Sequence, residues 1–393
     1  MRNAAPSRAP KVSLRGGTPP ARSPWRGGGW LAAGIGLLLL FPLSSPDAFF
    51  LDVFTTGFLL AAFAASWDVV GGVSGQITLG HALPFGTAAY ACALLTSFAG
   101  WPLPLAVAAA VLLAAAVGAG IGALSARLVG PFVALLTLAL GEIAHEAAVG
   151  HTFFSGPGGY AWGGEGGIPV ALPWRDAPPF WSYYAALAFL CLASFGMLRF
   201  SRSGAGLILR AVAGSPITAQ ASGVPIARFR RLAFTVGSAF AGAAGAGFVL
   251  HVGRATANDL SLELSFQAAT FAAVGGRGTI VGPVVAALVL HVLFQGLSLP
   301  PSARVLLYAL TLLVTLRFFP GGVVGTARDL ASRLGGKEGT RPPRRRGTTR
   351  ASCPAATSCP HATLPSPARS PRRRPSPPTA ALAGPRPVSP SSG

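Results

Sequence analysis

The chain has 393 residues, of which 51% are hydrophobic and only 11% are charged. Few charges together with many long apolar runs are typical of multi-spanning membrane proteins and argue against an ordinary soluble domain. The formal net charge of +20 arises mostly at the two ends: residues 1–28 hold six basic residues and no acid, and residues 336–393 hold eleven basic residues and one acid. The middle of the chain is therefore close to neutral.

The two basic ends are composed mainly of Pro, Gly, Ser, Ala and Arg. Such segments cannot bury enough apolar surface to fold, so residues 1–28 and 336–393 are predicted to be disordered tails. No recognised nucleic-acid module accompanies their arginines. Contact with anionic membrane lipid is the favoured interpretation, and no nucleic-acid partner is expected.

The four cysteines predict neither a disulfide framework nor a metal site. Cys92 and Cys191 fall inside apolar runs, where a reduced packing role is expected. Cys353, Cys359 and His361 lie in the basic tail at a spacing that matches no structural zinc pattern, so no metal is expected.

Ten apolar segments between the tails are predicted to be helices. The first follows basic residues, but no small-residue cleavage site comes after it, so an uncleaved spanning helix is favoured over a signal peptide. A full span needs about 20 residues. Three segments are shorter than that, and two of these are expected to be half-helices or to begin within loops. In chain order the ten are 30–43, 49–66, 82–99, 103–124, 131–149, 182–198, 232–251, 262–274, 282–297 and 304–319.

The arginines predict the orientation of these helices. With ten spans and a cytoplasmic amino terminus, eleven arginines of the core region fall on the inner side and three on the outer side. Cytoplasmic loops are enriched in Lys and Arg, so this asymmetry supports the count. The sequence therefore predicts an all-α, polytopic membrane bundle of about ten spans with both termini cytoplasmic.

Small residues recur four positions apart on two of the predicted helices. Gly118 and Gly122 form one such pair, and Ser238, Gly242 and Ala246 form another row. Small residues at this spacing let helix backbones approach closely in membranes. A compact helical bundle is expected from them.

The stretch 67–90 interrupts the apolar pattern with glycines and polar side chains. Each glycine inside a helix costs about 1 kcal/mol against alanine, so a straight spanning helix is disfavoured here. Broken backbone at membrane depth is tolerated only where it is buried in protein or lines a wet cavity. Because the predicted orientation places the stretch at the cytoplasmic end of two spans, Gln76, Thr78 and His81 are expected to belong to an inner gate beside the transport path.

A second polar group lies on the fifth predicted helix. Glu142 and His145 are one helical turn apart and could pair, and Glu146 lies on the same face. Ionisable residues at membrane depth are functional candidates by default, so Glu142 is added to the gate or transport-path residues. Asp68 and His81 are instead expected at the cytoplasmic boundary, in contact with water.

The loop 199–231 is the longest internal polar segment on the predicted cytoplasmic side. Ser215 is a favourable N-cap, Pro216 suits the first helical position and Gly223 suits the stop, which predicts a helix of about seven residues. Such a short helix is marginal alone. A docking element for a motor subunit is favoured over an ordinary interhelical loop.

No nucleotide-binding sequence accompanies this loop. The only Gly-Lys pair is Gly336-Lys337, and it is followed by Glu338 instead of the Ser or Thr of a phosphate-binding loop. No nucleophile–base pair stands out, so the chain is not expected to be an enzyme. If ATP drives transport, a partner chain hydrolyses it, and this chain binds no cofactor.

The motif Gly72-Val-Ser-Gly-Gln-Ile-Thr-Leu-Gly-His-Ala-x-x-Phe-Gly-x-x-Ala-Tyr90 resembles the hallmark of branched-chain amino-acid ABC transporter permeases, the LivM-type subunit in particular. Further blocks resemble the family in the same order, over about residues 30–325. They are Gly130–Ile143, Gly166–Pro169, Ser203–Leu207, Ala219–Val224, Ala233–Gly245 and Val274–Pro283.

The resemblance implies a permease domain over residues 29–325 with a fold like that of type II ABC importers, in the plasma (inner) membrane of a prokaryote. It implies as partners a second permease subunit, of LivH type, two ABC ATPase subunits that use ATP, and a periplasmic substrate-binding protein. The cargo would be a branched-chain or related amino acid. ATP hydrolysis is thereby assigned to the partner chains.

Within the loop 199–231 the resemblance implies a coupling helix that docks on an ATPase subunit. The residues assigned to this coupling loop are Arg210, Ser215, Pro216, Ala219, Ala221, Gly223 and Arg228. The family usually has an acidic residue where Pro216 stands and a charged residue where Gln220 stands. The contact is therefore expected to depend on shape and on the arginines, Arg230 included.

Two alternatives remain open. An ion-coupled secondary carrier of small solutes would need midplane carboxylates and often has repeated halves, whereas no internal repetition is evident here. A permease of the same family that imports urea or short amides fits the motifs equally well. Specificity in such systems resides largely in the receptor, so the substrate is not readable from this chain.

Overall fold

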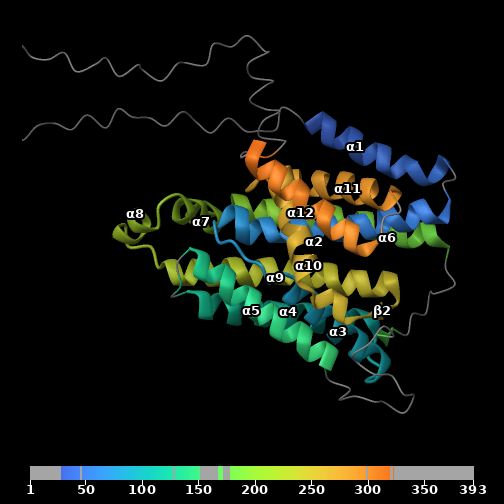
Figure 1. Ribbon diagram of the computed structural model, residues 1–393, viewed down its shortest axis with the longest axis horizontal. Helices are drawn as coiled ribbons and strands as arrows, with labels where there is room; N and C mark the ends of the chain where they lie inside the picture. Colours follow the sequence, from blue (N-terminus) through green and yellow to red (C-terminus); the bar gives the residue numbers. More distant parts are fainter. Residues whose placement is uncertain are drawn as a thin grey trace, which may run out of the picture. The chain divides into compact units, whose positions relative to one another are not determined.

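The computed structural model describes residues 28–44, 47–126, 128, 130–150, 167–170, 178–297, 300–318 and 322. The predicted disordered tails and the Cys353–His361 region lie outside these residues. Figure 1 shows the arrangement of the helices. They are α1 Gly28–Leu40, α2 Ala48–Asp68, α3 Ala82–Ser97, α4 Leu103–Ser125, α5 Pro131–Gly150, α6 Pro179–Arg202, α7 Gly204–Gly214, α8 Pro216–Ala221, α9 Ile226–Val252, α10 Leu262–Gly275, α11 Val281–Gly296 and α12 Pro301–Phe318.

Short elements connect these helices. The 3₁₀ turns are η2 Phe41–Ser44 and η4 Ala257–Leu260, the π-helical turn is η3 Val69–Val73, and the strands are β1 Ile168–Pro169 and β2 Arg254–Ala255. The strands pair antiparallel, with Ile168 opposite Ala255. In Figure 1 this small ladder lies at one end of the helices, and α7 and α8 lie at the other.

Each of the ten predicted apolar segments corresponds to a helix, with ends that differ by a few residues. By length and composition, five helices among the described residues are suited to cross a membrane: Ala48–Val73, Leu103–Ser125, Pro131–Val149, Pro179–Arg202 and Ile226–Val252. The 14 residues of α10 extend only about 21 Å, less than the ~30 Å of a hydrocarbon core. The helical membrane bundle is confirmed, whereas the count of ten spans and the cytoplasmic termini stay predictions.

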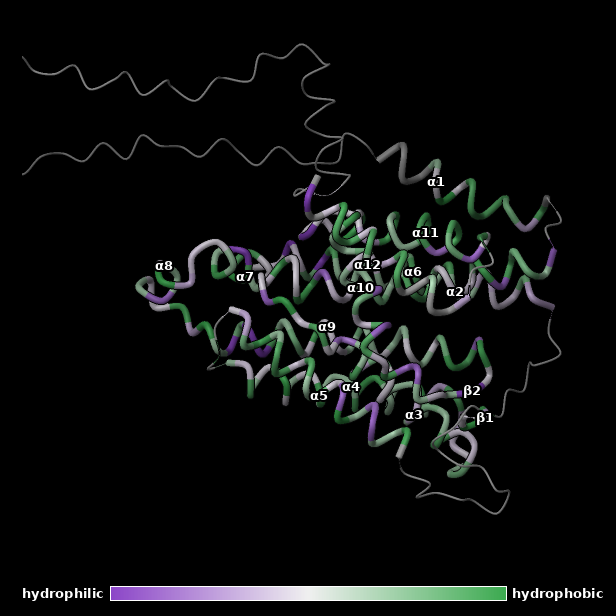
Figure 2. The backbone as a smooth tube through the Cα atoms, in the orientation of Figure 1, coloured by the Kyte–Doolittle hydropathy of each residue, from purple (hydrophilic) through white to green (hydrophobic). Residues whose placement is uncertain are grey.

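Helix α2 lies at the centre of the packing. It contacts α6, α9, α10 and α11. Phe58, Phe63 and Trp67 along it are each at most 1% exposed. From Gly57 to Asp68 every residue of α2 is buried. A helix segment surrounded on all sides has no need of a polar face, which explains why this part of the sequence is mostly apolar. The hydropathy colouring of Figure 2 shows the same predominance of green along α1 and α11.

The predicted small-residue contacts occur between α4 and α9, which pack side by side. A Cβ at Gly118 would overlap the side chain of Ser238 and the carbonyl of Phe234, and a Cβ at Gly242 would overlap Ala114. The two backbones therefore approach as closely as the sequence pattern predicted. This part of the packing prediction is confirmed.

The interruption predicted near residues 67–90 is present, but it begins later than the glycines alone indicated. The helical backbone continues through Gly71 and Gly72 as the π-helical turn η3. The non-helical part starts at Ser74 and ends at His81, before α3. Single π-turns of this kind are rare and occur frequently at functional sites.

Candidate functional site

Residues 69–81, called here the glycine-rich segment, fold back against the end of α2. The indole Nε1 of Trp67 donates to the carbonyl of Thr78 over 2.9 Å, and the backbone N–H of Gln76 donates to the carbonyl of Val70 over 3.2 Å. At Gly75, φ is +71°, which glycine adopts without strain. These contacts fix the segment as ordered structure beside α2.

The three candidate residues of this segment are all buried. Gln76 is 6% exposed, Thr78 1% and His81 2%. The Nε2 of His81 contacts Ser66 Oγ at 2.9 Å, and its ring stacks on Phe63 with centroids 5.3 Å apart. The Nε2 of Gln76 lies 3.5 Å from Ser74 Oγ, while its Oε1 has no hydrogen-bond partner among the described residues.

The expectation that water satisfies Asp68 and His81 at the membrane boundary is wrong. Asp68 is 0% exposed and His81 2%. Both polar groups are satisfied by the protein instead, because the glycine-rich segment and the start of α11 close over the end of α2. A sequence position near the end of an apolar run therefore did not imply contact with water.

Asp68 joins α2 to the turn between α10 and α11. Its Oδ1 accepts a hydrogen bond of 2.7 Å from the backbone N–H of Gly278, and its Oδ2 accepts one of 3.0 Å from the N–H of Ile280. Hydrogen bonds to an ionised acceptor are stronger than neutral ones. A Cβ at Gly72 would overlap both Asp68 Oδ1 and the backbone N of Gly278, so glycine is needed there for the contact to form.

The turn at residues 276–280 has an unusual backbone. Among the described residues, Ile280 alone combines a side chain with a positive φ; its φ is 58° and its ψ −50°. The N–H of Val281 donates to the carbonyl of Thr279 over 2.6 Å, which makes Ile280 the centre of a γ-turn of the rare, strained kind. For a β-branched residue such a conformation persists only where the surroundings hold it.

Helix α5 contacts the glycine-rich segment from the other side. The N–H of Leu79 donates to Thr137 Oγ1 over 3.1 Å, and a Cβ at Gly80 would overlap the carbonyl of Thr137. The predicted pairing of Glu142 with His145 is not what the structure shows. His145 Nδ1 contacts the carbonyl of Ala257 at 2.9 Å, since η4 packs against α5.

Glu142 is half-buried on α5, one residue beyond Gly141, whose Cβ position would contact the backbone of Gly80. Its Oε2 is buried and has no hydrogen-bond partner among the described residues. The structure thus brings α5 to the glycine-rich segment, as the assignment of Gln76, Thr78, His81 and Glu142 to one site requires.

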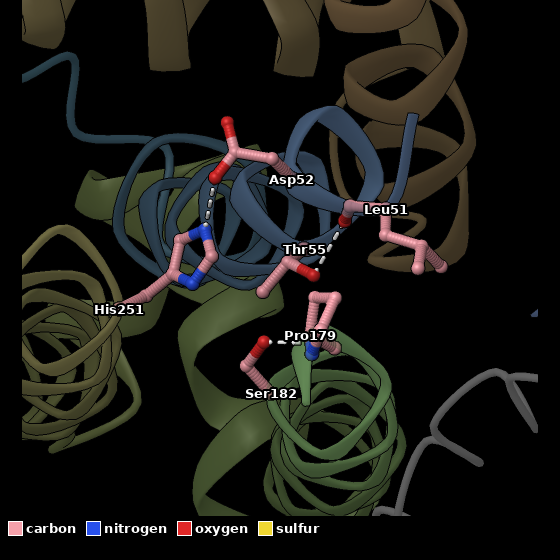
Figure 3. Close-up of polar contacts among 6 residues, drawn as sticks. All are labelled: Leu51, Asp52, Thr55, Pro179, Ser182 and His251. Carbon is pink, nitrogen blue, oxygen red and sulfur yellow. Dashed lines mark hydrogen bonds and ion pairs between the residues drawn. The ribbon is translucent and has the colours of Figure 1, made fainter. Parts of the chain in front are cut away.

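At the opposite end of α2, the side chain of Asp52 contacts that of His251 of α9, with Oδ1 and Nε2 3.0 Å apart. Figure 3 shows this contact together with the side-chain-to-carbonyl hydrogen bonds of Thr55 and Ser182. The carboxylate side chain is 67% exposed. Helix α2 thus contains two aspartates, of which Asp52 is exposed and Asp68 is buried.

The turn η4 contains a further buried carboxyl group, that of Asp259. Asp259 Oδ2 accepts from the N–H of Thr256 over 2.8 Å in a capping box. Burial raises the pKa of the Asp259 carboxyl to about 6, and this effect outweighs the opposite influence of the Thr256 hydrogen bonds and of Arg254. The group should titrate near neutrality.

The coupling loop contains the predicted short helix. Helix α8 runs from Pro216 to Ala221, its N-cap Ser215 accepts from the N–H of Thr218 over 3.4 Å, and Gly223 follows it with φ +80°. The cap, the first residue and the stop are all as predicted, and the helix is one residue shorter than expected. Residues 203–223 are called the coupling arm from here on.

The coupling arm also contains α7, which sequence reasoning missed. Ser203 caps it by accepting from the N–H of Gly206 over 3.4 Å. Leu209 and Val212 on one face are buried. The Ser-Gly-Ala-Gly start followed by apolar residues at three-residue spacing was the available signal.

The residues assigned to the coupling loop are not all exposed. Ala219 is 8% exposed and faces the chain's interior, whereas Ile217 is 83% exposed. Of the loop's arginines, Arg210 donates to Ser201 Oγ and Arg230 to the carbonyl of Leu128, so both engage the chain itself. Arg228 and Ala221 are exposed.

Comparison with known proteins agrees with this architecture. A family model described as "Branched-chain amino acid transport system / permease component" matches residues 49–316. The high-affinity branched-chain amino acid transport system permease protein LivM of Escherichia coli K12 is 26% identical over 268 residues, which cover 61% of this chain and 62% of that protein. The protein of the same name from Salmonella typhimurium LT2 is equally similar.

The chain thus spans 62% of the length of these curated relatives. No solved structure matches it. Together with the five helices long and apolar enough to cross a membrane, the family match indicates an integral membrane protein.

Proposed function

The chain belongs to the family of branched-chain amino acid transport system permease components, and from this premise we propose that it is the permease subunit of an ATP-driven, binding-protein-dependent importer. The observation that supports this most directly is the coupling arm. A capped helix of six residues with an apolar side chain 83% exposed is held at one end of the helices. An isolated helix of that length is marginal, so a partner surface is expected to hold it.

The partners follow from the same proposal. Two ABC ATPase subunits would bind the coupling arms of this chain and of a second, LivH-type permease chain, and they would hydrolyse ATP. A soluble substrate-binding protein would deliver the cargo at the opposite end. Membrane lipid would contact the outward apolar side chains of α4 and α6, for example Leu112 and Phe195, which are 70% and 67% exposed.

The orientation is proposed from charge. Ten spans in the plasma (inner) membrane of a prokaryote, with both termini and the coupling arm cytoplasmic, place eleven arginines inside and three outside. This arrangement also places α8 where an ATPase subunit could reach it. Tagging the amino terminus and residue 167 in turn, with accessibility measured from each side of the membrane, would test it.

We assign the glycine-rich segment and Glu142 to an inner gate. The buried Oε1 of Gln76 and Oε2 of Glu142 lack hydrogen-bond partners among the described residues, which costs free energy unless another state of the protein or a hydrated cargo satisfies them. A transport cycle supplies such a state. Thr78 and His81 support the segment through the Trp67 and Ser66 contacts.

The cargo is proposed to be a branched-chain amino acid or a related amino acid, with urea or a short amide as the second candidate. The relatives' names specify branched-chain amino acid transport, and the glycine-rich segment and α5 offer no charged ring that would suit an ion channel. Affinity measurements on the cognate receptor with leucine, isoleucine, valine and urea decide between them. Tight binding of urea and none of leucine would overturn the amino-acid assignment.

A further inference from the structure

The coupling arm touches the interior of the bundle at residues that also contact the glycine-rich segment. Leu209 of α7, Val73 of η3 and Ala233 of α9 form a small apolar cluster in which each residue is 0% exposed. One turn further along α7, a Cβ at Gly75 would contact Ala213. Ala213 is separated from the N-cap of α8 by a single residue, so α8 and the segment are linked through one short helix.

Arg210 adds a polar connection from the same helix. Its Nη2 donates to Ser201 Oγ over 2.8 Å and lies 3.4 Å from the carbonyl of Gly278. Gly278 belongs to the strained 276–280 turn. The guanidinium is planar and has several fixed donors, so it can hold Ser201 and the turn at once.

Asp68 completes the connection on the far side of that turn. It accepts from the N–H groups of Gly278 and Ile280, and it is the last residue of α2 before the π-helical turn η3. Arg210 thus contacts the carbonyl of the residue whose N–H binds Asp68. The contiguous order is coupling arm, turn, Asp68 and glycine-rich segment.

The turn has the properties expected of an element with two arrangements. Its Ile280 sits at a positive φ that costs free energy, and two hydrogen bonds to one carboxylate hold it there. Strained backbone of this kind clusters at active sites, ligand clamps and switch regions. The Asp68 side chain is buried, and both of its oxygens accept hydrogen bonds from the turn.

We propose that Arg210 and Asp68 are positioning residues that transmit movement of the coupling arm, through the 276–280 turn, to the glycine-rich segment. The proposal rests on the proposed function, since it requires an ATPase that moves the arm. Neither residue needs to contact cargo or nucleotide. What they set is the number of cargo molecules moved for each ATP hydrolysed.

The test uses the complete complex with its receptor in proteoliposomes and compares Asp68→Asn with Asp52→Asn. Asparagine presents one acceptor and one donor group to two N–H donors, so one of the two hydrogen bonds to the turn is lost. We expect Asp68→Asn to hydrolyse ATP while uptake per ATP falls about fivefold or more. Asp52→Asn, the same change at an exposed position of α2, should leave that ratio unchanged.

A purely structural role would lower hydrolysis and uptake together, in proportion to the amount of assembled complex. An unchanged uptake-to-hydrolysis ratio in Asp68→Asn therefore overturns the proposal. Should that variant fail to assemble, Arg210→Gln provides the same readout from an exposed position on α7, and an unchanged ratio there is equally decisive. Arg210→Lys keeps one charged donor group, so its ratio of uptake to ATP hydrolysis should lie between those of Arg210→Gln and the unsubstituted complex.

The double variant Asp68→Asn/Arg210→Gln shows whether the two residues act through one connection. If they do, its ratio is close to that of the worse single variant; independent effects that multiply would contradict the link. Failure of the proposed function is recognised separately, because the unsubstituted complex would then show no ATP-dependent uptake.

Discussion

The carboxylate of Asp68 accepts a 3.0 Å hydrogen bond from the backbone N–H of Ile280, a residue 212 positions later in the chain. It thereby ties the end of the central helix α2 to the one described non-glycine residue with a positive φ. The residue that directly precedes the glycine-rich segment is thus held by a partner far away in the sequence. It makes the conformation of Ile280 a direct experimental target.

Ile280→Gly should be more stable than Ile280→Ala. Both variants lose the buried side chain, but only glycine adopts a positive φ without strain, so the usual advantage of alanine is reversed by about 1 kcal/mol. The measurement is the thermal unfolding midpoint of the purified protein in detergent. A higher midpoint for the alanine variant would mean that Ile280 has an ordinary backbone conformation.

Ile217→Glu should prevent the ATPase subunit from co-purifying with the chain. Ile217 is 83% exposed on α8, so the substitution leaves the fold intact and places an unpaired charge in the proposed contact. Ile217→Val keeps the apolar surface and serves as the matched control. Co-purification of the glutamate variant at the level of the valine variant would exclude α8 as the docking helix.

Gly118→Leu should destabilise the protein, whereas Gly120→Leu should be tolerated. A Cβ at Gly118 would overlap Ser238, while nothing lies within 4 Å of the corresponding position at Gly120. Overpacking typically costs about 1–3 kcal/mol. Size-exclusion profiles and unfolding midpoints of the two variants report this, and equal losses would argue against close packing of α4 on α9.

Asp259→Asn should flatten the dependence of stability on pH. The pKa of Asp259 rises from its ordinary value of 3.8 to about 6 in the folded protein. Between these values the folded state retains a proton that the unfolded chain has released, so the free energy of unfolding contributed by this group falls as pH rises and is level above about 6. Asparagine does not titrate, although its oxygen still accepts the Thr256 N–H.

The readout is the unfolding midpoint in detergent at pH 4, 5, 6 and 7, compared between the asparagine variant and the unsubstituted protein. The variant should lose less stability across this range. An equal loss in both proteins would show that Asp259 does not hold its proton in the folded state.

The helices were predictable because their signals are local. Each apolar run became a helix, and Ser215, Pro216 and Gly223 specified the start and end of α8. Close packing of α4 on α9 was predictable from Gly118 and Gly242, since four-residue spacing places small residues on one face. Periodicity and capping need no knowledge of distant residues.

The surroundings of the polar residues were not predictable in this way. Asp68 lies at the end of an apolar run and was expected to meet water, but residues 278 and 280 provide its partners. The spacing on α5 allowed His145 to pair with its neighbour Glu142, whereas His145 contacts Ala257 in η4. In each case the partner is more than a hundred positions away, and no local pattern encodes it.

Ala219 illustrates the same limit at the surface. The sequence predicted correctly that Ala219 lies in the short helix. Which side of α8 faces outward, however, depends on the contacts of α8 with α7 and α9. In the structure Ile217 is exposed and Ala219 is buried. Ile217 is therefore the residue of α8 on which the docking prediction is tested.

The most direct test of the central claim is the energy source of uptake. Proteoliposomes that contain this chain, its permease partner and two ATPase subunits would be supplied with labelled leucine on the receptor. The account predicts accumulation with ATP at the ATPase side, none with a non-hydrolysable analogue, and none with an imposed proton or sodium gradient alone. Accumulation that follows the ion gradient without ATP would contradict it and would identify an ion-coupled carrier.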